Sequence, residues 1–431
     1  MKLKAGGEFE FMGEKLKVTK NKTHKLAVIF KNEQYKIITT EQEANSFIET
    51  GEGKAIFYKV EKIPDKNRTN NTINFKDCSF APSENANLTF KNIYFDNVTL
   101  ELEGKGSQKS YKALKFKNCT FHQKFKIRNE EQANPHNNKA NIEKLSFTNC
   151  VFHDNMYFRI GYLKIDNFQI SNLRNPPNSE VNLGELECKK FTIWNFRNMG
   201  KTKFYQINPQ EKNQGTFNIN NTSMGQADFQ SINLDDFKKV ILYENLFHDL
   251  VYSNIKWKKE IEAKNGDKNG DKDGDKETLL DSYRETLLDS YRVLKNTAKK
   301  NQDTEFALEF YAKEMKCLKE KISCKGSWAN WFVLKYNECT NNFGLNWWKP
   351  LIFLLVLGFI FYYILLSSLC LDFLDNVGQF FVFLNPTHKT EFIGEGSWNG
   401  STYFFDFLFR IIEGLLFYQT ITAFRKFSRG L

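Results

Sequence analysis

LKFKNCTF, at residues 114–121, is one of four related octapeptides, and their recurrence decides the fold. The other three are INFKDCSF at 73–80, LTFKNIYF at 88–95 and LSFTNCVF at 145–152. Together they define the template L-x-F-x-N-C-x-F. Apolar residues recur every five positions in these segments, which is neither the 3.6-residue period of a helix nor the two-residue period of a flat strand.

A five-residue step fits a chain that turns a corner after each pentad. One large and one smaller apolar side chain per pentad then point inward, and stacked coils align them into an aromatic ladder. The sequence therefore predicts a mainly β fold, an irregular right-handed β-helix of pentapeptide type, in which each buried Phe contributes about 1.5–3 kcal/mol. The predicted repeat core consists of Phe75, Phe80, Phe90, Phe95, Phe116, Phe121, Phe147, Phe152, Cys78, Cys119 and Cys150.

The three template cysteines occupy equivalent positions, so they could form a stacked metal or redox row. Packing is the simpler interpretation, because a small thiol fills the space beside each Phe as a hydrophobic side chain does. His122 and His153 follow the closing Phe of their units and are predicted to lie on the surface. The eight cysteines include no CxxC pair, which favours reduced thiols. We expect no metal, no cofactor and no catalytic residue.

The template resembles that of the bacterial pentapeptide-repeat family over roughly residues 70–230, although the motif decays after residue 170. Some members of this family mimic duplex DNA through an acidic surface. The repeats here are rich in lysine instead, as in YKALKFK at residues 111–117. Outward lysines protect a β-helix from edge aggregation, so we expect neither DNA mimicry nor a nucleic-acid partner.

Composition and periodicity divide the 431 residues into six predicted parts. A helical pattern from Phe237 to Leu250 predicts a helical cap, and two copies of ETLLDSYR from Glu277 begin a helical hairpin. A Gly/Asp/Lys repeat lies between them and lacks the glutamate that would complete an EF-hand. The parts are a small α+β N-terminal cap (1–65), the β-helix (66–234), a helical C-terminal cap (235–262), a flexible linker (263–276), a helical hairpin neck (277–325) and a membrane region (326–431).

Two segments of the last part are candidates to cross a membrane. Residues 351–371 carry no charge and are long enough for a hydrocarbon core of about 30 Å. The second segment, 403–424, carries Asp406, Arg410 and Glu413 at helical spacing on one face. This intramembrane polar face must pair internally, meet another subunit or line water. The alternative is an amphipathic helix that lies in the interface.

Charge asymmetry predicts the orientation of the two segments. The connection from Asp372 to Gly400 has one Lys against four acids, whereas Arg425, Lys426 and Arg429 close the chain. The N-terminal residues 1–8 show no apolar run after the first lysines, which predicts no cleaved secretory signal. We therefore expect a bacterial inner-membrane protein whose N-terminal body and C-terminus face the cytoplasm.

The end YQTITAFRKF, at residues 418–427, resembles the tail of membrane-bound pentapeptide-repeat proteins. Some of those proteins carry a two-helix pore like that of a potassium channel, but no T-x-G-Y-G filter lies between the two segments here. The leading hypothesis is a membrane-anchored cytoplasmic scaffold that binds lipid bilayer and a protein partner. The alternative is a subunit of a degenerate two-helix ion channel, which would assemble as a homo-oligomer. No nucleophile, phosphate-binding loop or carboxylate pair indicates an enzyme.

Overall fold

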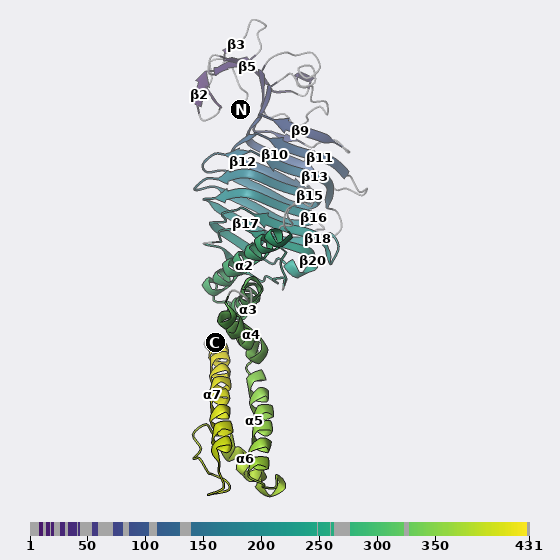
Figure 1. Cartoon of the computed structure of the whole chain (residues 1–431). Helices are drawn as coiled ribbons and strands as arrows, with labels where there is room; N and C mark the ends of the chain where they lie inside the picture. The colour runs from purple at the N-terminus through teal and green to yellow at the C-terminus, as the bar shows by residue number, and fades with distance from the viewer. Residues whose placement is uncertain are drawn as a thin grey trace. The chain divides into compact units, whose positions relative to one another are not determined.

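The computed structural model divides the chain into two compact units, Met1–Lys264 and Asn265–Leu431 (Figure 1). The predicted linker 263–276 falls outside the described residues except for its last position, as does most of the polar insert at 129–141. The structure describes residues 8–11, 14–17, 19–20, 26–30, 33–40, 42–43, 54–58, 72–80, 86–102, 110–129, 139–247, 249–258, 260–262, 276–322 and 327–428.

The first unit is a parallel β-helix of about seven turns, which confirms the predicted fold class. Two antiparallel arrangements come first, β1–β2 and β3–β4–β5, and parallel pairing begins with β5 and β6. The strands are β1 (Glu8–Phe11), β2 (Glu14–Lys17), β3 (Thr19–Lys20), β4 (Leu26–Phe30), β5 (Glu33–Ile38), β6 (Lys54–Tyr58), β7 (Thr72–Lys76), β8 (Ser79–Phe80), β9 (Asn87–Lys91), β10 (Tyr94–Leu102), β11 (Ser110–Lys117), β12 (Thr120–Asn129), β13 (Ala140–Thr148), β14 (Val151–Phe152), β15 (Tyr157–Asn175), β16 (Glu180–Asn198), β17 (Lys201–Pro209), β18 (Gln214–Asn220), β19 (Gln226–Gln230), β20 (Phe237–Tyr243) and β21 (Val251–Ser253).

The template phenylalanines form stacked columns inside the β-helix. Phe116 lies between Phe90 and Phe147, with ring centroids 5.0 and 4.7 Å away and nearly parallel planes. Phe95 lies in the same way between Phe75 at 5.4 Å and Phe121 at 5.1 Å. The predicted core side chains that the structure describes, which are all but that of Phe80, are buried. Stacking beyond simple burial adds about 0.5–1.5 kcal/mol per aromatic pair.

The asparagine of the template turns the corner between two faces. Asn118 and Asn149 have φ of 52° and 53°, in the left-handed region that Asn tolerates better than most residues. The same corner in later coils is formed by Asn172 and Asn195, with φ of 51° and 50°. The amide of Asn195 donates to Asn172 and that of Asn172 donates to Asn149, each at 2.8 Å. These stacked residues form an asparagine corner that runs along the β-helix.

The predicted helical cap over 235–262 is wrong. Residues Phe237–Tyr243 form strand β20, which pairs in parallel with β18, and the bridge between Ile241 and Glu262 extends the ladder further. Val240 and Leu242 point inward onto the preceding coil. The exposed hydrogen-bonding groups of β18 favour another strand, and this tertiary effect overrides the local helical pattern.

The predicted α+β character of residues 1–65 appears mainly as strands in the part that the structure describes. Only residues 42–43 are helical among the described positions. β6 already pairs in parallel with β7, and Phe57 packs against Phe75 at 5.7 Å. The stacked core therefore begins before residue 66.

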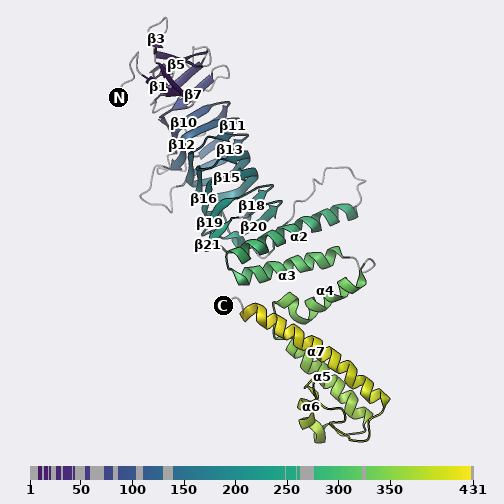
Figure 2. The ribbon, with the colours of Figure 1, turned by 90° about the vertical axis from the view of Figure 1, so that its left-hand side faces the viewer.

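The second unit is helical (Figure 2). α2 and α3 form the predicted helical hairpin, and the side chain of Asp303 caps α3 by accepting from the backbone N–H of Phe306 at 3.2 Å. The predicted connection between Asp372 and Gly400 contains a short helix, α6, which the sequence analysis did not anticipate. The elements are α2 (Lys276–Lys300), α3 (Thr304–Lys321), α4 (Trp328–Asn341), α5 (Lys349–Ser368), α6 (Val377–Phe383) and α7 (Gly400–Ser428), with short 3-10 turns at Asn342–Gly344 and Leu374–Asn376.

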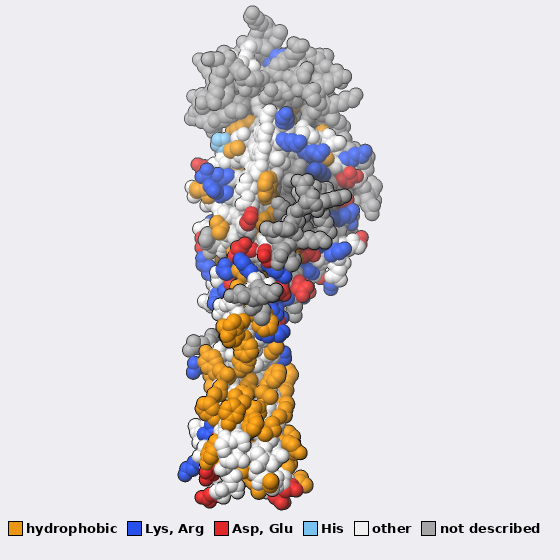
Figure 3. Space-filling view, viewed as in Figure 1, with side chains coloured by type: hydrophobic (Ala, Val, Ile, Leu, Met, Phe, Trp, Pro, Cys, Tyr) orange, Lys and Arg blue, Asp and Glu red, His pale blue; other side chains and the backbone are white. Residues whose placement is uncertain are grey.

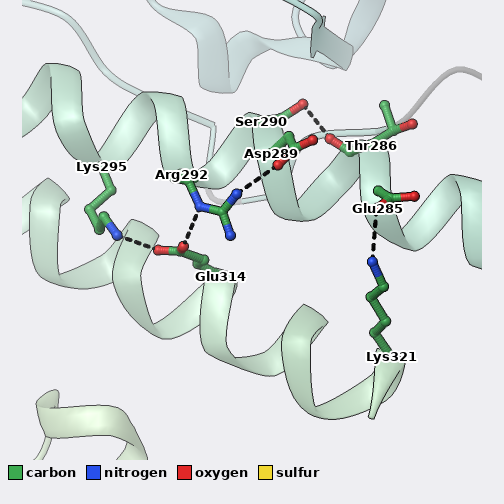
Figure 4. Close-up of polar contacts among 8 residues, drawn as sticks. All are labelled: Glu285, Thr286, Asp289, Ser290, Arg292, Lys295, Glu314 and Lys321. Carbon is green, nitrogen blue, oxygen red and sulfur yellow. Dashed lines mark hydrogen bonds and ion pairs between the residues drawn. The ribbon is translucent and has the colours of Figure 1, made fainter.

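Charged groups join the helices of the neck (Figure 4). The buried carboxylate of Glu314 on α3 accepts from Arg292 at 3.1 Å and from Lys295 at 2.5 Å, both on α2. Lys319 on α3 reaches Glu338 on α4 at 2.7 Å. Two cations on one buried carboxylate satisfy both of its oxygens, so these contacts fix how α2 and α3 pack.

Candidate functional site

The helical pair α5 and α7 has an apolar exterior. Figure 3 shows hydrophobic side chains covering these helices on the face turned to the viewer. Both helices are long and apolar enough to cross a membrane. Large hydrophobic side chains are exposed along each of them, namely Ile352, Phe353, Leu355, Val356, Phe359, Ile360 and Tyr363 on α5, and Tyr403, Phe404, Phe407, Ile411, Leu415, Tyr418, Ile421 and Phe424 on α7.

The interior of the same pair is partly polar. On α7, Thr402, Asp406, Glu413 and Gln419 are buried, together with apolar neighbours such as Phe409. The rest of this interior is apolar, as in a water-soluble hairpin, so the apolar exterior is what distinguishes the pair. Asp406 and Glu413 therefore lie on the inner side of α7, as does the face predicted from their spacing.

Asp406 is the centre of a cluster of ionisable groups. Its Oδ2 accepts from Arg410 Nε at 2.9 Å, one helical turn away on α7. Its Oδ1 lies 2.9 Å from Nε2 of His388, a side chain that is also buried. The sequence analysis predicted the pairing of Asp406 and Arg410 along the helix but did not include His388.

His388 links two acceptor groups through its ring. Its Nδ1 lies 2.7 Å from the backbone oxygen of Asn385, and a carbonyl oxygen can only accept, so Nδ1 is the donor in this contact. Its Nε2 faces Asp406 Oδ1. His388 therefore ties the connection before α7 to the centre of the cluster.

Glu413 differs from Asp406 because its carboxylate is not satisfied. The residue is fully buried, and among the described residues neither carboxylate oxygen has a hydrogen-bond partner. One guanidinium nitrogen of Arg410, Nη2, is also buried without a partner. An unsatisfied carboxylate inside an apolar helix pair is costly, so Glu413 is the residue of this cluster that stability alone does not explain.

The segment before α7 places His388 in the cluster. Phe383, at the end of α6, stacks on Phe409 of α7 with ring centroids 4.4 Å apart, and His388 packs against Phe392 at 4.9 Å. These contacts are tertiary, because α6 and α7 are joined by a connection without regular structure. The only sequence signal for His388 was a histidine in the connection between two apolar segments, of which the second carries Asp406, Arg410 and Glu413.

A second polar group lies near the C-terminal end of α7. Gln419 donates to Asn337 Oδ1 at 2.7 Å and accepts from Asn341, both on α4. A groove of about 610 Å³ lies beside it, and the wall of the groove includes Phe332, Tyr336 and Leu415. These amides satisfy one another, so they attach α4 to α7.

The described part of the β-helix carries ionic contacts. His122, predicted to lie on the surface, has Nδ1 3.1 Å from the buried carboxylate of Asp96, which also accepts from Lys76 at 2.7 Å. His122 and His153 contact each other with ring centroids 5.4 Å apart. No group of three or more metal-ligating side chains occurs among the residues that the structure describes.

The template cysteines use their thiols within the stack. Cys78 and Cys119 each donate to the backbone oxygen of a core Phe in the preceding coil, Phe57 at 3.1 Å and Phe90 at 3.4 Å. The hydrogen bond with Cys150, together with burial, raises the pKa of Cys119. These contacts place the cysteines among the packing residues.

The coil lengths vary along the β-helix. Equivalent residues are 20 apart from Lys76 to Asp96, 26 apart from Asp96 to His122 and 23 apart from Asn172 to Asn195. Four pentads would make every coil 20 residues long, so only the first of these intervals has the regular pentapeptide length. A comparison with protein-family models, curated proteins and solved structures gives no match to this chain. The resemblance to pentapeptide-repeat proteins therefore rests on the octapeptide template.

Proposed function

We propose that the chain is a membrane-anchored scaffold of the pentapeptide-repeat type, in which α5 and α7 span a bacterial inner membrane and the β-helix presents a binding surface to a protein partner in the cytoplasm. The observation that carries this proposal is the apolar exterior of a helix pair that also buries Asp406 and Glu413. Lipid is the environment that favours this arrangement, because contact between the apolar exterior and water is unfavourable.

The chemistry of the hairpin supports an anchor that is complete in one chain. Asp406 has both of its partners, His388 and Arg410, within the same unit. A charge at mid-membrane depth costs on the order of 3 kcal/mol or more unless it is paired. Internal pairing removes most of this cost for Asp406, so this carboxylate does not depend on a second subunit.

Two natural cysteines provide a test of the topology. Cys339 lies on α4, before the first proposed span, and Cys370 lies just after it; both are exposed. The positive-inside rule places Cys370 on the outer side and Cys339 in the cytoplasm. We expect a membrane-impermeant maleimide to label Cys370 in intact spheroplasts and to label Cys339 only after lysis.

The other described thiols help this experiment because they are wholly or partly buried, which suppresses their reactivity. Cys324 lies outside the described residues, so the labelling uses a Cys324→Ser background. Burial raises the pKa of Cys188, and it raises that of Cys317 to about 11, so few thiolates are present near pH 7. The variants Cys370→Ser and Cys339→Ser identify each labelled site. Recovery of the chain in the soluble fraction, or equal labelling of both cysteines in intact spheroplasts, would contradict the proposed anchor and orientation.

A second candidate function, a conducting subunit, is favoured by the unsatisfied carboxylate of Glu413. Intramembrane acids often belong to ion or proton pathways. In this alternative, purified protein in liposomes produces cation or proton flux as a symmetric oligomer. Glu413→Gln keeps the shape but removes the charge, and is expected to lower the flux at least tenfold. Glu395→Gln, on the exposed connection, is the matched control. Silent liposomes that contain a monomer would exclude this function.

A further inference from the structure

One face of the β-helix has cations and no acids among its described outward positions. It consists of the outward side chains of residues 87–91, 113–117, 144–148, 167–171 and 190–194, which are aligned in parallel register. We call it the acid-free face. Its outward charged side chains are Lys91, Lys115, Lys117, Lys144 and Lys190.

Two arginines continue this charge beyond the asparagine corner. Arg174 and Arg197 are exposed and lie directly opposite each other on β15 and β16. With Asn172 and Asn195, they line a shallow hollow of about 430 Å³. Arg174 contacts the sulfur of Met199 at 3.2 Å, and neither arginine forms an ion pair with any described residue. The hollow therefore offers two guanidinium groups that pair with no described carboxylate, beside a row of amides.

On the remaining faces of the β-helix, several cations form ion pairs. Arg128 pairs with Glu101 at 2.7 Å, and Lys139 pairs with Glu187 at 2.8 Å. Lys189, next in sequence to Lys190, pairs with Asp166 at 2.8 Å at the edge of the acid-free face. Several cations elsewhere thus form ion pairs, although Lys126 lies beside Lys124, Arg128 and Arg159. The lysines of the acid-free face form no ion pair with any described residue.

This arrangement is unfavourable for the protein alone. Lys91 lies opposite Lys117, as Arg174 lies opposite Arg197, and like charges in adjacent strands about 4.8 Å apart repel each other. A bound polyanion would relieve this repulsion. The cost to the free protein therefore indicates a surface shaped for binding.

We propose that the acid-free face and the adjoining hollow bind an acidic, extended segment of a protein partner. The strands from Lys91 to Arg197 occupy five successive coils, about 19 Å along the axis, which an extended chain of about six residues spans. This proposal rests on the scaffold function and names the chemistry of its partner.

Nucleic acid fits this surface less well than an acidic peptide does. Binding of single strands without sequence preference uses several aromatic side chains on which bases stack. Trp194 is the one aromatic side chain among the described outward positions of the acid-free face. Hydroxyl and amide groups occupy many of the other positions, and those of the partly exposed Thr148 and Gln169 can donate to carboxylates.

The test uses the full-length protein in detergent and a fluorescein-labelled octaglutamate peptide, followed by fluorescence anisotropy at several salt concentrations. We expect saturable binding that weakens with salt, and Arg174→Glu with Arg197→Glu should lower the affinity at least tenfold. Lys144→Gln with Lys190→Gln, a milder pair, should lower it about threefold. The control reverses two exposed lysines on β17, Lys201→Glu with Lys203→Glu, and should retain the affinity to within twofold.

Three results would overturn the proposal. They are absence of saturable binding, an equal loss in the Lys201/Lys203 control, and tighter binding of a labelled eight-nucleotide thymidine DNA than of the peptide. Circular dichroism of each variant shows that the β-helix is retained. This assay needs no membrane, so it tests the acid-free face separately from the anchor. A soluble chain that binds the peptide would contradict the anchor and support the acid-free face. A membrane-anchored chain that does not bind the peptide would support the anchor and contradict the acid-free face.

Discussion

Replacing Phe116 with alanine should lower the free energy of unfolding of the β-helix by about 3–5 kcal/mol, the usual range for removal of a fully buried Phe. Phe116 has no exposed surface and stacks on Phe90 and Phe147. Its loss leaves a cavity between two coils, because the strands on either side are held in register and cannot collapse into it. Urea denaturation followed by far-UV circular dichroism measures the change.

Lys117→Ala is the matched control for this variant, since Lys117 is the next residue and is exposed. It should change the free energy of unfolding by less than about 0.5 kcal/mol. Phe116→Leu keeps most of the apolar volume, so its free energy of unfolding should lie between those of Phe116→Ala and Lys117→Ala. Equal stability of Phe116→Ala and Lys117→Ala would mean that the aromatic columns do not hold the coils together.

Replacing Asp406 with alanine should destabilise the helix pair of α5 and α7 by about 3–5 kcal/mol, as for removal of one partner from a buried ionic cluster. Asp406 contacts both His388 and Arg410. Its removal leaves Arg410, which keeps its charge, without its carboxylate partner.

Thermal unfolding in detergent, followed by tryptophan fluorescence, measures this loss because five of the seven tryptophans lie in the second unit. Asp406→Asn retains one oxygen acceptor and should lower the unfolding midpoint by less than Asp406→Ala does. Glu395→Ala removes an exposed carboxylate from the connection before α7 and should leave the midpoint unchanged. A midpoint for Asp406→Ala equal to that of Glu395→Ala would show that the cluster does not stabilise the helix pair.

Local patterns predicted much of this protein because some interactions lie close together in sequence. The octapeptide template specifies an inward Phe and a corner Asn within a few residues, so the conformation of each template segment is set by nearby residues. The pairing of Asp406 and Arg410 lies one helical turn apart on a single helix. Length and composition alone were sufficient to identify the two apolar helices, because such segments need no partner to be recognised.

Residues 235–262 show where local patterns fail. Phe237, Val240 and Ile241 satisfy a helical period, yet they form strand β20 because β18 offers unpaired backbone groups. Such groups belong to a strand about 23 residues earlier. The helical pattern reflects only residues a few positions apart, so it cannot report a partner that far away. The same reason explains why parallel pairing also continued beyond the region in which the template was recognisable.

The amino-acid sequence by itself determined the stacked β-helix, the helical hairpin and the two apolar helices, since each depends on periodicity, turn residues or uninterrupted hydrophobicity within one segment. Only the tertiary structure decided that His388 contacts Asp406, that Glu413 is buried without a partner, and that seven scattered cations share an acid-free face and its adjoining hollow. The physical reason is that burial, hydrogen bonding and charge depend on which distant side chains come within a few ångströms, and the packing of coils and helices sets those distances.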